Sequence, residues 1–294
     1  MTPIVDAHTH LFTPEVLADR AGYLRRDAWF EHLYANPRAV LVAAEALLTS
    51  MDEAGIAQSI VCGFPWRDLG LCREHNAYLA EVIGRSDGRL AWLATVPPHQ
   101  GEPAATEAER CLGAGAVGLG ELNADAQGFD LAAPDALRPV VEVCVSASRP
   151  VMLHASEPVG HAYAGKGSAT PDRLLRFVEA FPELTVVAAH WGGGLPFYEL
   201  MPEVAAAAAR IVYDSAASTY LYRFQVFRAA LDIVGRERVM FASDYPVLRQ
   251  DRFLRRVLDA GLQDEEMAPV LGGNARRVYV LAAPVGVGAL GAPA

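Results

Sequence analysis

Short apolar runs alternate with longer segments of helical periodicity along this chain. The apolar runs are continuous rather than alternating with polar residues, which is typical of parallel strands that are covered on both faces. Eight runs are predicted to be strands: Pro3–Ala7, Gln58–Cys62, Leu90–Val96, Ala116–Gly120, Arg149–His154, Leu184–His190, Arg210–Asp214 and Arg238–Ser243.

A predicted helix lies between each pair of consecutive strands, and further helices follow the last strand. The predicted helices are Ala39–Ala54, Glu74–Gly84, Ala104–Leu112, Asp135–Ala147, Pro171–Phe181, Pro202–Ala209, Tyr222–Val234, Arg249–Ala260, Asp264–Leu271 and Asn274–Leu281. Strands that alternate with helices pair in parallel through right-handed crossovers. Eight such units favour a closed (β/α)8 barrel (TIM barrel) over an open doubly wound sheet.

The chain has 294 residues and 52% hydrophobic residues, enough for the core of one barrel domain over residues 1–283. Residues 284–294 are predicted to be a loose C-terminal tail. Residues 11–39 form a long insertion after the first strand, and Trp29 and Tyr34 lie within it. In a barrel this insertion is expected over the mouth, at the ends of the strands where substrates bind.

Charge and cysteine content narrow the classes of partner. The formal net charge is −10 and the basic residues are scattered, which argues against a nucleic-acid surface. No signal-peptide pattern or long apolar span is present, so we expect no membrane partner. The four cysteines form no CxxC pair, which favours reduced thiols and a cytoplasmic location.

Two histidines end the first strand in the run Asp6-Ala-His8-Thr-His10. Side chains at positions i and i+2 of a strand point the same way. Two imidazoles on one side of a strand, at the catalytic end of a barrel, can bind one metal ion. Taken alone, the HxH pattern fits a polar turn equally well.

Three further polar residues stand where an apolar strand stops, and they strengthen the metal hypothesis. His154 ends the fifth strand, His190 ends the sixth, and Asp244 follows the eighth. All therefore fall on the same rim of the barrel, which indicates a metal-dependent active site. Asp214 also reaches the rim and is predicted to be a structural hydrogen-bonding acid. Three histidines outside this pattern are predicted to be surface or loop residues: His32, His75 and His99.

This arrangement of HxH, two single histidines and a terminal aspartate resembles the amidohydrolase superfamily. The runs HWGGGLP (190–196), FASDYP (241–246) and GNARR (273–277) are similar to its amidohydrolase 2 branch, which contains aminocarboxymuconate-semialdehyde decarboxylase and many hydrolases. The resemblance covers Ile4 to Tyr279. It implies that one divalent ion is held by four ligands: His8, His10, His154 and Asp244. We expect Zn²⁺, with Mn²⁺ as an alternative, since imidazole and carboxylate suit both.

The resemblance also implies catalytic roles. Asp244 would accept a proton from metal-bound water, and His190 would act as acid or base. Many binuclear relatives bridge two ions with a carboxylated lysine on the fourth strand, but the chain's single lysine, Lys166, lies elsewhere. Glu121 ends the fourth strand instead. It is either a ligand of a second ion or a partner that holds a histidine, and a mononuclear site is favoured.

Substrate contacts are expected from the insertion and from the loop after the fifth strand. That loop, residues 157–167, carries His161, Tyr163 and Lys166, which could bind a carboxylate or phosphate. A solvated, glycine-rich loop is the alternative. Trp29 of the insertion suggests a partly aromatic or apolar pocket.

The main functional prediction is hydrolysis of a small amide, lactone or ester by a metal-activated water. The alternative is decarboxylation of a small aromatic or unsaturated carboxylic acid at the same site. A phosphodiesterase of the TatD type and a barrel that only binds ligand are weaker readings, because the chain is acidic and all five ligand-type residues are present. The expected partner is a small molecule, and the resemblance also suggests a homodimer.

Overall fold

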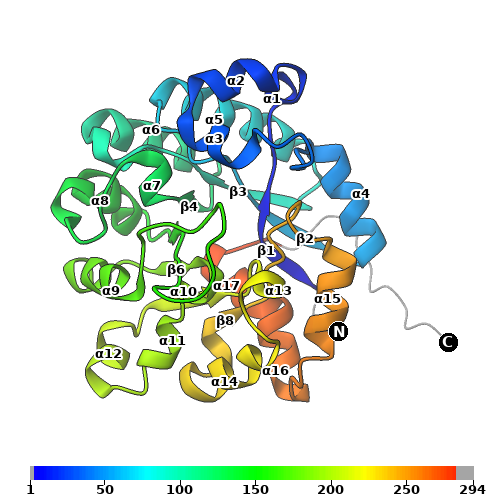
Figure 1. Ribbon diagram of the computed structural model, residues 1–294, viewed down its shortest axis with the longest axis vertical. Helices are drawn as coiled ribbons and strands as arrows, with labels where there is room; N and C mark the ends of the chain where they lie inside the picture. Colours follow the sequence, from blue (N-terminus) through cyan, green and yellow to red (C-terminus); the bar gives the residue numbers. More distant parts are fainter. Residues whose placement is uncertain (1–2, 283–294) are drawn as a thin grey trace.

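The computed structural model describes residues 3–282, in which eight strands form one parallel sheet in chain order (Figure 1). The strands are β1 (Val5–His10), β2 (Gln58–Cys62), β3 (Leu90–Ala94), β4 (Gly118–Leu122), β5 (Val151–Leu153), β6 (Val186–Ala188), β7 (Ile211–Asp214) and β8 (Val239–Met240). The backbone N–H of Ala7 donates to the carbonyl of Phe241 at 3.0 Å, and that of His10 donates to Tyr245 at 2.7 Å. These bonds join the last strand segment to β1, so the predicted (β/α)8 barrel is confirmed.

The chain also has helices, most of which surround the strands on the outside of the barrel (Figure 1). They are α1 (Pro14–Ala18), α2 (Arg20–Arg26), α3 (Ala28–Tyr34), α4 (Ala44–Ala54), α5 (Leu69–Gly84), η1 (Pro98–Gln100), α6 (Glu102–Gly113), α7 (Ala124–Gln127), η2 (Pro134–Leu137), α8 (Arg138–Ser146), α9 (Pro171–Ala180), α10 (Ala189–Gly192), α11 (Leu195–Tyr198), α12 (Pro202–Ala207), α13 (Ser218–Leu221), α14 (Gln225–Val234), η3 (Arg236–Arg238), α15 (Gln250–Leu258), α16 (Asp264–Ala268), η4 (Pro269–Gly273) and α17 (Asn274–Tyr279). Within these residues no helix is long and apolar enough to cross a membrane. The predicted tail at 284–294 lies outside the described residues.

Strand β8 is shorter than the sequence suggests. Residues 241–243 are apolar enough to continue it, but their N–H groups bond elsewhere: Phe241 donates to the carbonyl of Val270 at 2.8 Å. The N–H of Ser243 donates to the carboxylate of Asp6 at 2.9 Å. Tertiary hydrogen bonds therefore replace strand pairing here, and they set the position of Asp244.

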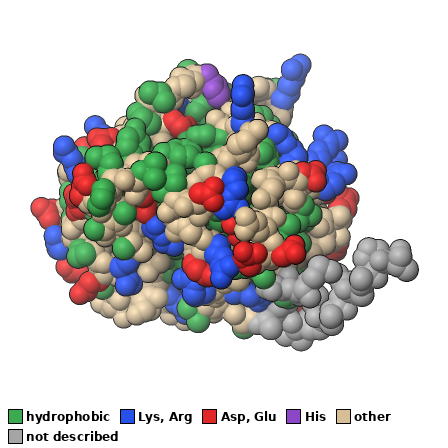
Figure 2. Space-filling view, turned by 90° about the horizontal axis from the view of Figure 1, so that it is seen from below, with side chains coloured by type: hydrophobic (Ala, Val, Ile, Leu, Met, Phe, Trp, Pro, Cys, Tyr) green, Lys and Arg blue, Asp and Glu red, His purple; other side chains and the backbone are tan. Residues whose placement is uncertain are grey.

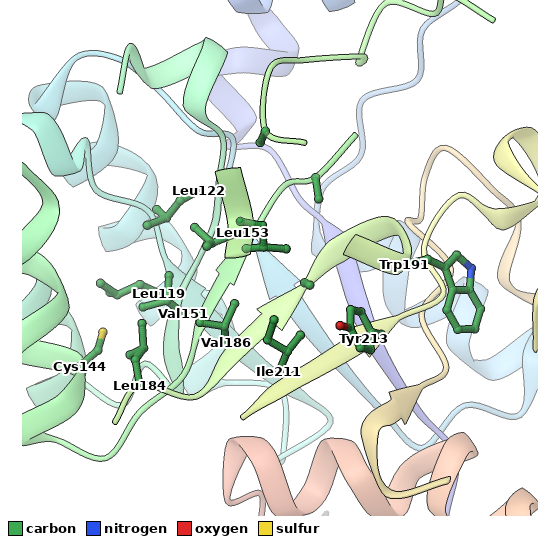
Figure 3. Close-up of a cluster of buried hydrophobic side chains, with 14 of the residues drawn as sticks. Leu119, Leu122, Cys144, Val151, Leu153, Leu184, Val186, Trp191, Ile211 and Tyr213 are labelled. Atoms are coloured by element: carbon green, nitrogen blue, oxygen red, sulfur yellow. The ribbon is translucent and has the colours of Figure 1, made fainter. Parts of the chain in front are cut away.

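Alternate strand residues face two separate apolar layers. Outward residues pack against the surrounding helices, as Figure 3 shows for Leu119, Val151 and Val186 beside Cys144 of α8. Inward residues such as Met152 fill the barrel interior with side chains from the other strands. This period-two division produces a solid barrel whose polar chemistry is confined to the strand ends.

The insertion after β1 folds into three short helices, each started by a side-chain cap. Thr13, Asp19 and Asp27 accept hydrogen bonds from backbone N–H groups of the first turns of α1, α2 and α3. The apolar faces of this segment pack around Phe30 and Trp66. The insertion is thereby held as a rigid wall beside the barrel mouth.

His75 of α5 is not a surface residue, contrary to the prediction. It is buried, its Nε2–H donates to the carbonyl of Leu11 at 2.9 Å, and its Nδ1 accepts from Trp66 Nε1–H at 3.0 Å. His75 therefore connects the start of the insertion to α5.

Acidic and basic side chains are interspersed over the face of the molecule drawn in Figure 2.

Candidate metal centre

Side chains from six strands meet at the carboxyl end of the barrel. The residues that gather there are His8 and His10 at the end of β1, Glu121 in β4, His154 just after β5, His190 just after β6, Asp214 at the end of β7 and Asp244 after β8. In a parallel barrel all these strand ends open on one face, which is why residues far apart in sequence converge.

The first group consists of His8, His10 and Asp244. The Nε2 atoms of His8 and His10 lie 3.0 Å apart, and Oδ1 of Asp244 lies 3.2 Å from Nε2 of His10. Oδ1 of Asp244 is 3.9 Å from Nε2 of His8. These atoms are close enough to bind one cation together.

The second group consists of Glu121, His154 and His190. Oε1 of Glu121 lies 2.8 Å from Nδ1 of His154 and 3.1 Å from Nε2 of His190. The four expected ligands of a single ion are thus divided, since His154 lies with Glu121 and not with His8 and His10. Glu121, which sequence reasoning left between two roles, is at the centre of this second group.

Glu121 also spans the space between the groups. Its other oxygen, Oε2, lies 3.7 Å from Nε2 of His8 and 3.9 Å from Nε2 of His10. One carboxylate therefore faces both groups, a different oxygen toward each.

Asp214 accepts hydrogen bonds from two residues of the cluster. Its Oδ2 accepts from Nδ1–H of His8 at 2.9 Å, and its Oδ1 accepts from the backbone N–H of His190 at 2.9 Å. The Oδ1 atom also accepts from the N–H of Ala216 at 3.0 Å. Asp214 is thus the structural hydrogen-bonding acid that the sequence predicted.

The buried carboxylates dominate the electrostatics. Burial alone would lower the pKa of His8, but the charges of Asp214 and Glu121 outweigh it and raise that pKa to about 9. Burial is likewise outweighed at His190, where the hydrogen bond to Glu121 raises the pKa to about 10. Three buried carboxylates thus attract positive charge where no lysine or arginine of residues 3–282 contacts them. A divalent cation with nitrogen and oxygen ligands fits this donor set.

Backbone strain accompanies two of these residues. His190 (φ 56°) and Asp244 (φ 65°) adopt the left-handed conformation, which non-glycine residues rarely adopt. The glycines of the HWGGG run permit the turn that follows: a Cβ on Gly193 (φ 62°) would lie 2.3 Å from the carbonyl oxygen of Ser156. This run therefore brings the end of β6 against the segment that follows His154.

A pocket of about 500 Å³ opens above the cluster. Its floor includes Glu121, Asp244 and three imidazoles, and its wall is aromatic. The wall residues that the sequence anticipated are Trp29, Tyr34, His161 and Tyr163; those it missed include Arg38, Phe64 and Tyr220. Arg38 and Phe64 lie on connecting segments and Tyr220 lies in the four-residue helix α13, where no periodic pattern marks them.

Lys166 is not among the residues that line this pocket. Its Nζ donates to the carbonyls of Val159 and His161 at 2.7 and 3.3 Å. Both acceptors belong to the same loop, so the ammonium group closes the loop on itself. The loop contacts the cluster instead through the carbonyl of Gly165, which lies 2.9 Å from Nε2 of His154.

A family model described as amidohydrolase matches residues 5–281. The chain belongs to the amidohydrolase family. The gamma-resorcylate decarboxylase of Polaromonas sp. is 24% identical over 324 residues, which cover 92% of this chain and 97% of that protein.

Solved structures agree on the fold. The 5-carboxyvanillate decarboxylase of Sphingomonas paucimobilis has a TM-score of 0.80 at 19% identity and covers 96% of this chain and 100% of its own. A dihydroxybenzoic acid decarboxylase of Polaromonas sp., with bound manganese and 2-nitroresorcinol, has a TM-score of 0.71 at 21% identity. The match covers 95% of this chain and 97% of that one.

These comparisons correct the main functional prediction. The matching curated relatives are decarboxylases, not hydrolases of amides, lactones or esters. The sequence motifs did not separate the two, because both reactions use the same ligand types at the same strand ends. A divalent metal is supported, whereas the expected preference for zinc is not: the metal named in the Polaromonas structure is manganese.

Proposed function

We propose that this protein is a metal-dependent decarboxylase of small aromatic carboxylic acids. The observation that carries the proposal is the position of an aromatic-walled pocket directly over a buried cluster of imidazoles and carboxylates. A planar ring would pack against Trp29, Tyr34 and Phe64, and its carboxylate would face the metal-binding residues of the floor. The relatives named above act on substrates of this type.

His8, His10 and Asp244 would hold the divalent ion, and Mn²⁺ is proposed ahead of Zn²⁺. When bound, such an ion supplies positive charge that holds substrate oxygens and stabilises charge developing on the ring. Because Nδ1–H of His8 donates to Asp214, Nε2 is the nitrogen that faces the site and would bind the ion on losing its proton.

The reaction exchanges a carboxylate for a proton. A C–H bond forms at the ring carbon that bears the carboxylate, then the C–C bond breaks, its electron pair returns to the ring, and CO2 leaves. Burial would raise the pKa of Asp244, but the hydrogen bond to His10 and the charge of His8 lower it below its ordinary value, so the carboxylate is ionised at rest. Asp244 is therefore proposed to take a proton from a water molecule in the pocket and pass it to the ring carbon from Oδ2, because its contacts with His8 and His10 are made by Oδ1.

His190 is less suited to direct delivery. Its Nδ1 faces the carbonyl of Ala216 at 3.3 Å, and its Nε2 faces Glu121 at 3.1 Å. Neither ring nitrogen is free to reach a ring carbon. We therefore assign His190 to the second group of the cluster rather than to the proton transfer.

The test is direct assay of the purified, Mn²⁺-loaded protein. Release of CO2 and loss of ring-acid absorbance would be followed with 2,6-dihydroxybenzoate and 5-carboxyvanillate, with benzamide and aromatic lactones as hydrolysis controls. Turnover of an aromatic acid that ceases on chelation is expected. Cleavage of amides or lactones without decarboxylation of any aromatic acid would overturn the proposal.

The proposed partner is a small molecule rather than a nucleic acid, consistent with a pocket of about 500 Å³ over the cluster and with the mixed surface charge. The homodimer and the cytoplasmic location remain predictions from the sequence.

A further inference from the structure

Three large hydrophobic side chains lie exposed at the mouth of the pocket. Val40, Tyr220 and Val247 border it, and 55%, 58% and 49% of their surfaces are accessible. On the floor of the same pocket, Glu121 and Asp244 are only 5% and 7% exposed. The pocket therefore runs from a buried polar floor to an exposed apolar rim, the name used below for Val40, Tyr220 and Val247.

The apolar rim is built by three segments that are neighbours around the barrel. Val40 follows the insertion after β1, Tyr220 lies in α13 after β7, and Val247 follows β8. Strand β7 pairs with β8, and backbone hydrogen bonds join the segment after β8 to β1. The apolar rim therefore occupies one side of the mouth, while His161 and Tyr163 border the pocket from the loop after β5.

Hydrogen bonds fix two of the rim residues relative to the floor. The backbone N–H of Val247 donates to the carbonyl of Asp244 at 2.8 Å, so one turn joins this rim residue to the group proposed for proton transfer. Helix α13, which carries Tyr220, is held at its first residue: Oγ of Ser218 accepts from Nε1–H of Trp191 at 2.7 Å. The exposed apolar surface is thus part of the built site.

A ring that carries only small polar groups would leave this rim in water. The pocket volume of about 500 Å³ lies in the range of pockets that enclose drug-sized ligands, whereas a dihydroxybenzoate is a single ring. In the proposed function the carboxylate faces the floor, so the ring carbon opposite it points toward the mouth. We propose that the preferred substrate is an aromatic acid with an alkyl group on that opposite carbon, which covers the apolar rim. This inference rests on the proposed function for the orientation of the ring.

The apolar rim is favoured as a ligand surface over a docking surface for a second copy of the chain. Single exposed hydrophobic side chains are ordinary on proteins, but three from separate segments around one pocket mouth form a patch. The apolar surface also continues inward, because Leu221 and Pro246 line the same pocket and are partly buried. A chain that enters the pocket covers this inward surface, whereas a second copy seated on the mouth covers only the rim.

The test is the affinity of an unreactive series for the full-length, Mn²⁺-loaded protein. The series is 2-nitroresorcinol and its 5-methyl, 5-propyl and 5-carboxy derivatives, in which a nitro group takes the place of the carboxylate and cannot leave as CO2. Each buried methylene strengthens binding by roughly fourfold. Calorimetric titration is therefore expected to give a Kd that falls from parent to methyl to propyl, by roughly 10-fold or more in all, with no such gain for the carboxy derivative.

Variants of the apolar rim localise the effect. The propyl gain is the ratio of the Kd of the parent to that of the propyl derivative, measured within one protein. Val40→Asn and Val247→Asn should each lower this ratio by roughly threefold or more. Val159→Asn is the matched control and should retain it, because Val159 is 74% exposed but is not among the described residues that line the pocket. Thermal unfolding checks each variant, and Tyr220→Ser replaces one that fails to fold.

The overturning results are equally specific. An absent propyl gain in wild type, tighter binding of the carboxy than of the propyl derivative, or no binding by the whole series would each overturn the inference. So would an unchanged ratio in Val40→Asn and Val247→Asn, and conversion of a dimer to a monomer in those variants would then assign the rim to a second copy. Binding is separate from turnover: a propyl gain without decarboxylation of any aromatic acid contradicts only the proposed function, and decarboxylation of 2,6-dihydroxybenzoate without a propyl gain contradicts only this inference.

Discussion

The carboxylate of Asp214 hydrogen-bonds Nδ1–H of His8 at 2.9 Å, and both side chains are fully buried. Because the carboxylate accepts at Nδ1, the opposite nitrogen of His8 faces the cluster and is the one available to a cation. The other oxygen of Asp214 holds the backbone of His190. One side chain of β7 therefore orients the end of β1 and fixes the end of β6.

Asp214→Asn should weaken metal binding by roughly 10- to 100-fold. The amide must turn its NH2 group toward either His8 or the N–H of His190, and both are donors in the present arrangement. Metal titration of wild type and variant would measure the loss. Asp87→Asn, at an exposed turn with φ 50°, is the matched control. Unchanged affinity in Asp214→Asn would contradict this role.

Asp244→Asn should lower kcat for decarboxylation by about 10²- to 10⁴-fold, the usual contribution of a positioned acid or base. The amide keeps an oxygen for the cation but cannot carry the transferred proton. The rate would be measured at saturating Mn²⁺, with metal content determined on the same sample. Near wild-type turnover in a fully loaded variant would show that another group delivers the proton.

Trp29→Ala should raise KM by roughly 2- to 10-fold with a smaller change in kcat, since an aromatic pair contributes about 0.5–1.5 kcal/mol. Trp29 lines the pocket, whereas Lys166 holds the carbonyls of its own loop. Lys166→Met should therefore leave KM nearly unchanged. If Lys166→Met raised KM as much as Trp29→Ala, the ammonium group would have to reach substrate.

Because of His75, the free energy of unfolding should decrease as the pH is lowered. Burial lowers its pKa to about 4, below the ordinary value of 6.5. As the pH falls, His75 therefore takes up a proton in the unfolded chain at a higher pH than in the folded protein. The stability that the neutral imidazole contributes is complete above pH 6.5 and is lost as the pH falls toward 4. The loss amounts to about 3 kcal/mol.

His75→Gln removes the titrating group but retains a donor for Leu11 and an acceptor for Trp66. Its free energy of unfolding should lie below that of wild type at pH 7, and the gap should shrink toward pH 4. Urea unfolding of both proteins across this range measures the gap. A gap that stays constant from pH 7 to pH 4 would refute the assignment.

Several features followed from local sequence because they depend on nearest neighbours and burial. Continuous apolar runs indicated strands covered on both faces, and β2 has the predicted bounds, Gln58–Cys62. The strand-end positions of His8, His154 and His190 followed too, since a polar residue directly after a parallel strand must lie on the catalytic rim. The family motifs identified the superfamily but not the reaction.

Other features depended on contacts between distant segments. Sequence order cannot give the rotation of the ring of His154, which its bond to Gly165 sets, so its separation from His8 and His10 was invisible. The central position of Glu121 likewise needed the distances from β1, β5 and β6. The sequence by itself determined the barrel and which strand ends carry ligands, because period and burial are local properties. Only the tertiary structure decided how those ligands divide into two groups, because hydrogen bonds to partners from other strands and loops aim each side chain.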